Sequence, residues 1–132
     1  MSLLGILNYV NGTLEADTDV SDIVGNNIFP NIVPDFDGDG QVTFPLIVMD
    51  RQSVEPVYTK TDGCRQDNVS VAVTCWSVSY EECVDLAEKV LTALEFQKGD
   101  VNGVVVDRCR LASADEGFEE VAYYQRLIFN FK

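Results

Sequence analysis

Three aspartates at alternate positions form the densest group of potential metal ligands in the chain. Asp35, Asp37 and Asp39 are each separated by one residue, and Gly40 follows the third. Calcium is a hard cation that needs several oxygen ligands close together, and alternate carboxylates on a tight loop supply them. The spacing raises the hypothesis of a calcium site. It equally suits a polar turn in which the glycines reverse the chain.

Comparison with a complete calcium-binding loop favours the turn. The segment 35–43 resembles the first nine positions of an EF-hand or dockerin loop, but Leu46 stands where a bidentate carboxylate is needed. Pro34 precedes the segment and Pro45 follows it, so neither flanking helix of an EF-hand is expected. We therefore interpret the segment as a polar turn and keep calcium binding by its three aspartates as a secondary hypothesis.

The chain contains few groups that could carry enzymatic chemistry. Histidine is absent, which removes the commonest general base and the partner of Ser-His and Cys-His nucleophiles. The paired carboxylates at 81–82, 115–116 and 119–120 fall at an expected helix start or in an expected loop, where charge is ordinarily solvated. The sequence therefore predicts no catalytic residue and no cofactor, and we expect a protein that is not an enzyme.

The four cysteines, Cys64, Cys75, Cys83 and Cys109, lack the spacing of a zinc or redox site. No pair has the Cys-x-x-Cys pattern. The N-terminal sequence shows neither a positive region nor a signal cleavage site. We expect a protein made in the reducing cytoplasm, with free and mostly buried thiols. A Cys75–Cys109 bridge stays open as an alternative if the strands that carry these residues pair.

Net charge argues against two classes of partner. Among 132 residues, 22 Asp and Glu face nine Lys and Arg, which gives a net charge of −13, and no basic patch is visible. Such a surface repels phosphate backbones and anionic lipid, so neither tight nucleic-acid binding nor membrane association is expected. The length and an apolar content of 46% fit a single domain over 1–132. No apolar stretch approaches the ~20 residues that span a bilayer.

Three arginines are candidates for contacts between subunits. Arg108, Arg110 and Arg126 are nearly all the positive charge of the C-terminal strands, and alternation puts the first two on one face. They are expected to pair with carboxylates of the same chain or with an acidic neighbouring subunit.

Three apolar residues in a polar segment are further interface candidates. Val54, Val57 and Tyr58 have no obvious core partner in the sequence pattern. They are expected either to pack on the body of the same domain or to form part of a protein interface.

Apolar periodicity and turn residues predict the elements that carry these groups. A helix capped by Ser2 is expected over 2–11, with Leu4 on its apolar face, and a short turn around 19–24 is expected to end at Gly25. A second helix is expected from Ser79 to before Gly99, where Ser79 and Glu82 make a capping box. Strands are expected at about 28–33, 44–50, 68–78, 103–111 and 121–131. The segment 52–66 is expected to be a long loop or a projecting hairpin, and 113–119 a loop.

This order of elements predicts an α+β fold. We expect a mainly antiparallel sheet of about 4–5 strands, packed by one long helix, with an N-terminal helix and a projecting loop or hairpin added. The apolar face of the sheet should include the alternating residues Val69, Val71, Val73 and Cys75. The long helix should cover that face with its apolar stripe.

Several motifs follow one another in a fixed order along the chain. They are Asp22-Ile23-Val24-Gly25 with Ile28-Phe29-Pro30, then Phe44-Pro45-Leu46-Ile47-Val48, then Val69-x-Val71-x-Val73 with Trp76-Ser77, and finally Tyr123-x-x-Arg126-x-x-Phe129-x-Phe131. In this order they resemble the tail completion, or tail terminator, proteins of long-tailed bacteriophages. The segments 35–43 and 51–66 depart from the family pattern.

The resemblance implies a structural protein of the virion tail that has no enzymatic activity. Such proteins form a ring, commonly a hexamer, that stops growth of the tail tube and meets the head connector. The partners implied are other copies of the chain, the tail tube protein and the connector proteins, while genome DNA passes through without specific binding. A head-tail joining or head-completion protein of a phage or prophage is the alternative, and a calcium-binding module is a more distant one.

Overall fold

The computed structural model of the chain describes residues 3–25, 27–31, 44–58, 65–119 and 122–132. The helices are α1 (Ile6–Ala16), α2 (Thr18–Val24) and α3 (Tyr80–Leu94). The strands are β1 (Ile28–Pro30), β2 (Leu46–Tyr58), β3 (Arg65–Ser77), β4 (Gly99–Val101), β5 (Val104–Val106), β6 (Cys109–Glu119) and β7 (Ala122–Phe131). Five strands form one sheet in the order β1-β2-β3-β7-β6, and β4 pairs with β5 separately. β1 is parallel to β2 and the other pairs are antiparallel, so the predicted α+β class is confirmed.

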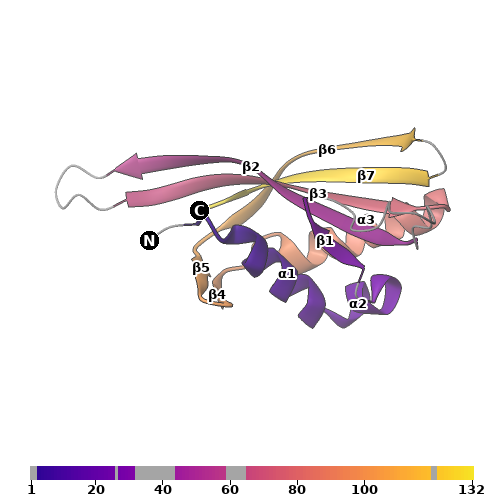
Figure 1. Cartoon of the computed structure of the whole chain (residues 1–132), viewed down its shortest axis with the longest axis horizontal. Helices are drawn as coiled ribbons and strands as arrows, with labels where there is room; N and C mark the ends of the chain where they lie inside the picture. The colour runs from indigo at the N-terminus through magenta and orange to yellow at the C-terminus, as the bar shows by residue number, and fades with distance from the viewer. Residues whose placement is uncertain (1–2, 26, 32–43, 59–64, 120–121) are drawn as a thin grey trace, which may run out of the picture.

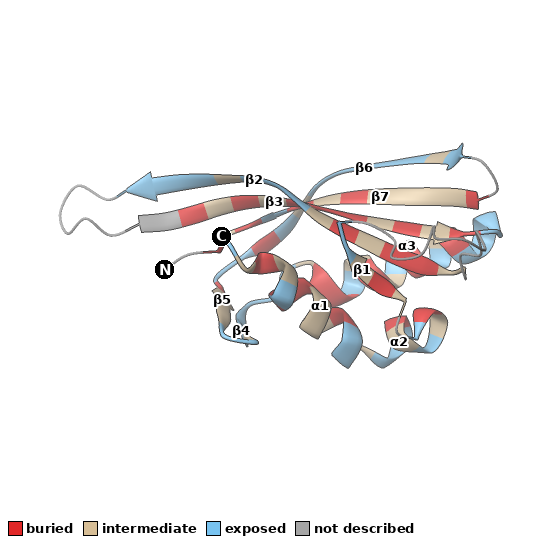
Figure 2. Ribbon diagram, in the orientation of Figure 1, coloured by how far each residue is buried: buried red, intermediate tan, exposed pale blue. Residues whose placement is uncertain are grey.

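The three helices lie on one side of the sheet (Figure 1), and the core lies between them and the strands. Val69, Val71, Val73 and Cys75 of β3 are all buried, as their alternation predicts (Figure 2). The helix α3 buries Cys83, Leu86, Ala87, Val90, Ala93 and Leu94 against this face. The helical stripe and the strand alternation therefore meet in one core, and the opposite face of the sheet is left without a helix among the described elements.

Serine side chains define the start of α3. The Oγ of Ser79 accepts a hydrogen bond from the N–H of Glu82 at 3.4 Å, which confirms the predicted N-cap. The reciprocal half of the capping box differs from the prediction. The carboxylate of Glu82 accepts from the Oγ of Ser77 at 2.6 Å, and that same Oγ accepts from the N–H of Ser79 at 3.2 Å. The buried Ser77 thus takes the place that Glu82 has in a capping box.

The N-terminal helix is displaced from its predicted range. α1 begins at Ile6 and ends at Ala16, in place of the expected 2–11, and the expected capping residue lies outside the described part of the chain. Its buried residues, Ile6, Tyr9, Val10 and Leu14, keep helical spacing beyond residue 11. Leu4, assigned to the apolar face by the sequence pattern, is 59% exposed because it precedes the helix.

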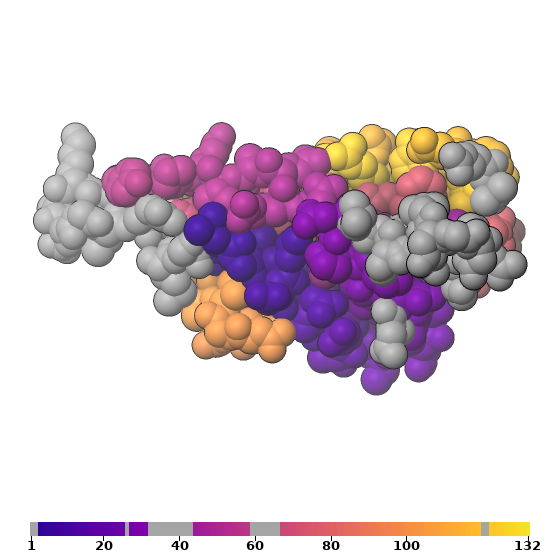
Figure 3. Space-filling model, in the orientation of Figure 1, coloured from indigo at the N-terminus to yellow at the C-terminus, as the bar shows by residue number. Residues whose placement is uncertain are grey.

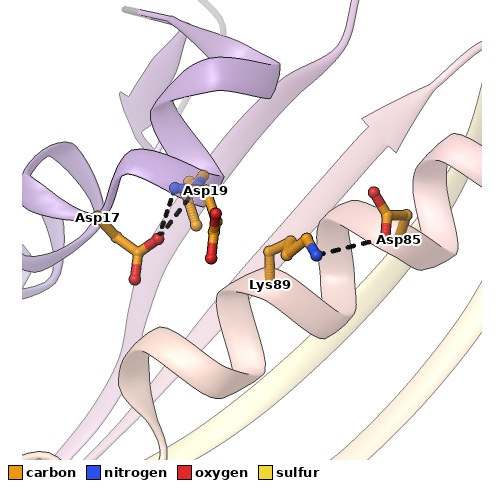
Figure 4. Close-up of polar contacts among 5 residues, drawn as sticks. Asp17, Asp19, Asp85 and Lys89 are labelled. Carbon is orange, nitrogen blue, oxygen red and sulfur yellow. Dashed lines mark hydrogen bonds and ion pairs between the residues drawn. The ribbon is translucent and has the colours of Figure 1, made fainter.

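The second helix follows α1 directly and is capped by a carboxylate. Asp17 accepts hydrogen bonds from the N–H groups of Asp19 at 3.0 Å and Val20 at 3.2 Å (Figure 4). The helix α2 ends at Gly25, as predicted, where φ is +58°. Figure 4 also shows the ion pair between Lys89 and Asp85, one turn apart on the solvent side of α3, at 3.9 Å.

The strand β2 is longer than predicted and settles the alternatives for 52–66. The expected strand 44–50 continues to Tyr58, and β3 begins at Arg65, so the two form a projecting hairpin. A register shift between Arg51 and Ser53 marks a bulge at the point where the hairpin leaves the body. The strand β1 pairs with β2 only at 47–49, which confirms it as a short edge strand.

The C-terminal strands differ most from the prediction. The expected strand 103–111 is divided between β5 and β6, and β5 pairs with β4 across the turn Asn102-Gly103, where φ is +54° and +81°. Positive φ at both turn residues is the signature of a tight Asn-Gly hairpin, a signal present in the sequence. The segment 113–119, expected to be a loop, is strand. β6 pairs with β7 on both sides of a bulge between Leu111 and Ser113 and continues to Glu119. The hairpin β4–β5 packs beside α1 (Figure 3), where the Asn102 side chain donates to the carbonyl of Asn8.

The predicted alternative of a Cys75–Cys109 bridge is wrong. Cys75, Cys83 and Cys109 are free and buried. Cys75 of β3 pairs in register with Gln125 of β7, and Cys109 of β6 pairs with Phe131 at the far end of that strand. Because β7 separates β3 from β6, the two cysteines lie on strands that do not pair.

Candidate assembly surfaces

The β2–β3 hairpin extends well beyond the body of the domain (Figure 1). We call its outer part the arm, formed by Ser53–Tyr58 of β2 paired with Arg65–Ser70 of β3. In the arm, β2 is exposed at every position except Val54 (Figure 2). A two-stranded ribbon of this kind has little stability alone, so the arm depends on its attachment to the body.

A buried carboxylate attaches the base of the arm. Asp67 of β3 is 1% exposed and accepts a hydrogen bond from the backbone N–H of Leu3 at 2.8 Å. Val54 pairs with the buried Val69 and packs against the core cluster. Val54 was expected either to pack on its own domain or to form an interface. The structure shows it partly buried against its own domain.

The tip of the arm carries the two other apolar candidates. Val57 is 46% exposed and Tyr58 is 64% exposed. Successive residues of a strand point to opposite faces, so the tip presents an apolar group on each side. Exposed apolar side chains on a projecting ribbon are typical of a surface that a partner covers.

The three arginine candidates share the face of the sheet that bears no described helix. In the register of β6 and β7, Arg110 lies opposite Asn130 and Arg126 lies opposite Asp115. Arg108 precedes β6, and its N–H and C=O bond to the backbone of Lys132 at 3.0 and 2.8 Å. Since 126, 130 and 132 alternate along the end of the chain, the three arginines lie on one face. Arg108 and Arg110 are exposed and Arg126 is half-buried.

Aromatic side chains gather at the other end of the sheet, where the sequence pattern predicts no interface. We call Tyr80 of α3, Phe118 of β6 and Tyr123 of β7 the aromatic end. The Tyr123 ring lies 4.8 Å from that of Phe118 and 5.5 Å from that of Tyr80, between ring centroids. Phe118 is 58% exposed and Tyr80 is 44% exposed. The available signal was Phe118 itself, an apolar residue in a segment expected to be a polar loop.

Hydrogen bonds hold the aromatic end in place. Glu116 accepts from the Nε2 of Gln125 and from the Oη of Tyr80, each at 2.9 Å. These two donors lower the pKa of the Glu116 carboxyl, the Gln125 bond more than the Tyr80 bond. The same contact raises the pKa of the Tyr80 hydroxyl, because its proton is held by a carboxylate. The surface is thus apolar, ordered and edged by a negative charge.

The described chain has a cavity beside α1 and no cluster of metal-ligating side chains. A cavity of about 340 Å³ opens beside α1 and is lined by Leu4, Gly5, Leu7, Asn8, Asn31 and Arg51. The Arg51 guanidinium donates to the carbonyl of Leu4 at 2.9 Å. The residues that line this cavity include no nucleophile and no general base. Within the described residues no three His, Cys, Asp or Glu side chains group as metal ligands. Asp35, Asp37 and Asp39, the calcium candidates, lie outside the described residues.

The three described thiols, those of Cys75, Cys83 and Cys109, are buried. Burial raises the pKa of Cys83 to about 11 and that of Cys109 to about 12, and it raises the pKa of Cys75 as well. The Sγ of Cys83 lies 3.2 Å from the carbonyl oxygen of Cys75 and donates to it. Neutral, buried thiols of this kind fill the core.

The family model described as "Tail completion protein gp17" matches residues 9–132, nearly the whole described chain. The chain belongs to the tail completion protein gp17 family. The resemblance found in the sequence is thereby confirmed. As a member of this family, the chain is a structural protein of a phage tail.

Comparison with solved structures supports the same fold. A chain from the virion of a native gene transfer agent particle superposes with a TM-score of 0.77 and 16% sequence identity, covering 92% of this chain and 89% of that chain. No curated protein sequence matches this member of the tail completion family. None of the described helices is long and apolar enough to cross a membrane.

Proposed function

We propose that the chain completes the tail tube as one subunit of a ring and joins that ring to the head connector. The ring is a homo-oligomer, with six copies as the expected number. Its partners are the tail tube protein at one side and the connector proteins at the other. The chain acts through binding surfaces and performs no reaction.

The observation that carries this proposal is the arm. The exposed tip at Val57 and Tyr58 is joined to the body through a buried base at Asp67. An arm that reaches past its own domain can contact a neighbour without changing the subunit's core. When the surface at one end of a subunit contacts a different surface on the next copy, the assembly closes into a ring if the rotation allows it.

Charge supports contact between copies as well. Arg108, Arg110 and Arg126 lie on the helix-free face of the sheet. Two of the three helices on the other side, α2 and α3, carry carboxylates in their first turns: Asp19, Glu81 and Glu82. We assign the arginines to ion pairs with acidic surfaces of a neighbouring subunit, where Arg is favoured.

The net charge also fits the passage of DNA. A chain with a net charge of −13 gives any ring built from it a strongly negative potential. Phosphate backbones would be repelled from the wall of such a channel, so genome DNA would pass without being held. DNA is therefore proposed as cargo that crosses the ring and not as a bound ligand.

Electron microscopy of the purified chain, alone and mixed with tail tubes, tests the proposal. We expect rings in solution or rings that cap tube ends. A chain that stays monomeric and leaves the tubes unchanged would contradict ring formation and tube completion together. Rings that bind connector proteins but ignore tubes would favour the head-tail joining alternative.

The arginine contact has its own variant. Arg126→Glu should leave the fold intact and weaken assembly, because the new carboxylate on the helix-free face would repel the acidic surface of the neighbouring subunit. Lys98→Glu changes the net charge equally at an exposed position between α3 and β4 and serves as the control. Analytical ultracentrifugation measures both, and equal assembly of the two variants would show that Arg126 only pairs within its own chain.

A further inference from the structure

Three cations gather at one end of β6, on the face of the sheet that bears no described helix. The backbone groups of Arg108 and Lys132 bond to each other at 3.0 and 2.8 Å. Arg110 lies opposite Asn130 in the register of β6 and β7. Because opposite residues of an antiparallel pair and alternate residues of a strand share a face, the three cationic side chains point to the same side. We call Arg108, Arg110 and Lys132 the cationic corner.

The cationic corner has few anionic partners in its own chain. None of its three side chains forms an ion pair with a described residue. Arg108 and Arg110 are exposed. Asp107 is the one acidic side chain in the segments 104–111 and 128–132, so the corner is net positive in a chain of net charge −13. Exposed arginines without an internal partner are available to an acidic surface of another molecule.

The aromatic end, at the other end of β6, has the opposite charge. The sequence segments 78–85 and 115–125 contain no Lys or Arg. The Glu116 carboxylate accepts a hydrogen bond from Tyr80, so it lies on the same face as the rings. Glu81 is exposed in the first turn of α3, next to Tyr80. Opposite potentials on two surfaces steer their association and fix its orientation.

Aromatic rings beside a carboxylate form a surface that guanidinium groups bind. The face of a ring attracts a cation, and the planar guanidinium stacks on the ring while it donates to the carboxylate. The Tyr123 ring contacts those of Phe118 and Tyr80. Gln125 and the Tyr80 hydroxyl both donate to Glu116. The surface is therefore ordered before any partner arrives, which lowers the cost of binding.

A single chain cannot join these two surfaces. Arg110 stands near the beginning of β6 and Phe118 near its end, about 25 Å apart along the strand, and their side chains point to opposite faces of the sheet. Figure 1 shows β6 running along the body between the two positions. A second copy, placed with its helix-free side over the helix side of the first, brings its cationic corner to the aromatic end.

We propose that Arg108 and Arg110 of one copy dock on the aromatic end of the next copy. The contact rests on the proposed ring and names the surfaces that join its members. The guanidinium groups stack on the exposed rings of Tyr80 and Phe118 and donate to Glu116. Each copy offers one cationic corner and one aromatic end, so every such surface is filled when the ring closes.

An exchange of charge between the two surfaces tests the contact. Arg110→Glu and Glu81→Arg should each raise the concentration needed for ring formation about tenfold, with the thermal midpoint of the subunit unchanged, as measured by analytical ultracentrifugation and thermal unfolding. The chain with both substitutions should return to within about threefold of the native value, because the opposite charges meet again between copies. The control joins Arg110→Glu with Glu15→Arg, on an exposed position of α1, and has the same net charge. Equal recovery of the two double variants, or recovery of neither, would overturn the contact.

Cross-linking locates the contact while keeping both arginines and all three rings. All variants carry Cys64→Ser, which leaves only the buried thiols of the native chain. Asn130→Cys protein is mixed with Glu81→Cys protein under conditions in which rings form, alone or on tail tubes, and treated with a short bis-maleimide. We expect a covalent dimer beyond that given by either protein alone. In the control mixture Glu15→Cys replaces Glu81→Cys, and we expect at least tenfold less product.

The outcomes separate this contact from the proposed function. Rings without the product of Asn130→Cys and Glu81→Cys, or with equal product in the control, would overturn the contact and leave the ring proposal standing. If Arg110→Glu leaves ring formation unchanged but abolishes retention of a DNA duplex on the ring, the cationic corner faces nucleic acid and the contact is overturned as well. If neither rings nor the product form with or without tubes, the ring proposal fails and the contact fails with it.

Discussion

The two halves of β3 share one strand and one alternation but lie in different surroundings. Val71, Val73 and Cys75 are buried beneath the helices. Residues 65–68 of β3 pair with β2 alone, while residues 69–76 have β2 on one side and β7 on the other. The difference shows that pairing forms the strand in both places, whereas packing under the helices occurs in the body and, through Val69, reaches only the base of the arm. Stability should therefore reside in the body and assembly in the arm.

Truncating a buried aromatic side chain of the body should have the largest effect on the free energy of unfolding. Phe129→Ala deletes a fully buried ring on the helix-covered face and should lower the free energy of unfolding by about 3–5 kcal/mol. Tyr58→Ala, on the arm, should change it by no more than about 0.5 kcal/mol. Urea denaturation followed by tryptophan fluorescence measures both. Similar losses for the two variants would show that the arm contributes to the folded body as much as the core does.

The joint between body and arm should have the next largest effect. Asp67→Ala leaves the buried N–H of Leu3 without this acceptor and should cost about 1–3 kcal/mol. Amide hydrogen exchange should show faster exchange in the arm than in β7. Uniform acceleration over both would mean that Asp67 serves the whole domain and that the arm has no separate attachment.

A helix cap gives a smaller effect within the body. Ser79→Ala removes the acceptor for the N–H of Glu82 and should cost about 0.5–2 kcal/mol. Ser53→Ala, an exposed serine of the arm, should be nearly neutral. If the thermal midpoints of the two variants coincide, the Ser77 contacts are enough to begin α3.

The alkylation rates of cysteine thiols should differ between the body and the arm of the folded protein. Because burial raises the pKa of Cys83 to about 11 and of Cys109 to about 12, iodoacetamide at pH 8 should modify them only as fast as the chain unfolds. A cysteine placed at Tyr58 should react at the rate of a free thiol. Mass spectrometry of timed samples measures this, and rapid modification of the native body would contradict its close packing.

The same pKa shifts predict the direction of the pH dependence. The thiols of Cys83 and Cys109 ionise near pH 9 in the unfolded chain, whereas in the folded chain their pKa values are about 11 and about 12. Between these values the folded state binds more protons, so stability is full below pH 9 and falls as the pH rises above it. Thermal midpoints at pH 8 and pH 10 measure the effect, with Cys83→Ala as the reference for a smaller decline.

The sequence predicts the body better than the edges of the sheet, for a physical reason. Burial on one face leaves a period in the sequence, and this period located β3 and α3. The strand β6 is exposed over most of its length, so it has no such period and was expected to be partly a loop. The turn at Asn102-Gly103 was missed for a different reason, since its signal was local and the apolar run around it suggested one continuous strand.

Of the two candidate assembly surfaces, the tip of the arm is indicated by the sequence and the aromatic end is not. Val57 and Tyr58 were identifiable because apolar residues stand out in a polar segment, and the structure places both on the exposed tip. The aromatic end could not be found by spacing. Tyr80, Phe118 and Tyr123 come from three elements, and only the pairing of β6 with β7 and the position of α3 bring them together.

Tail tubes grown in the presence of the chain should reach a shorter length if this protein completes the tail. Purified tail tube protein is polymerised with increasing, substoichiometric amounts of the chain, and tube lengths are measured by electron microscopy. We expect shorter tubes as the chain is added, with a ring at the tube end. An unchanged distribution of lengths and bare ends would contradict the claim that this protein completes the tail.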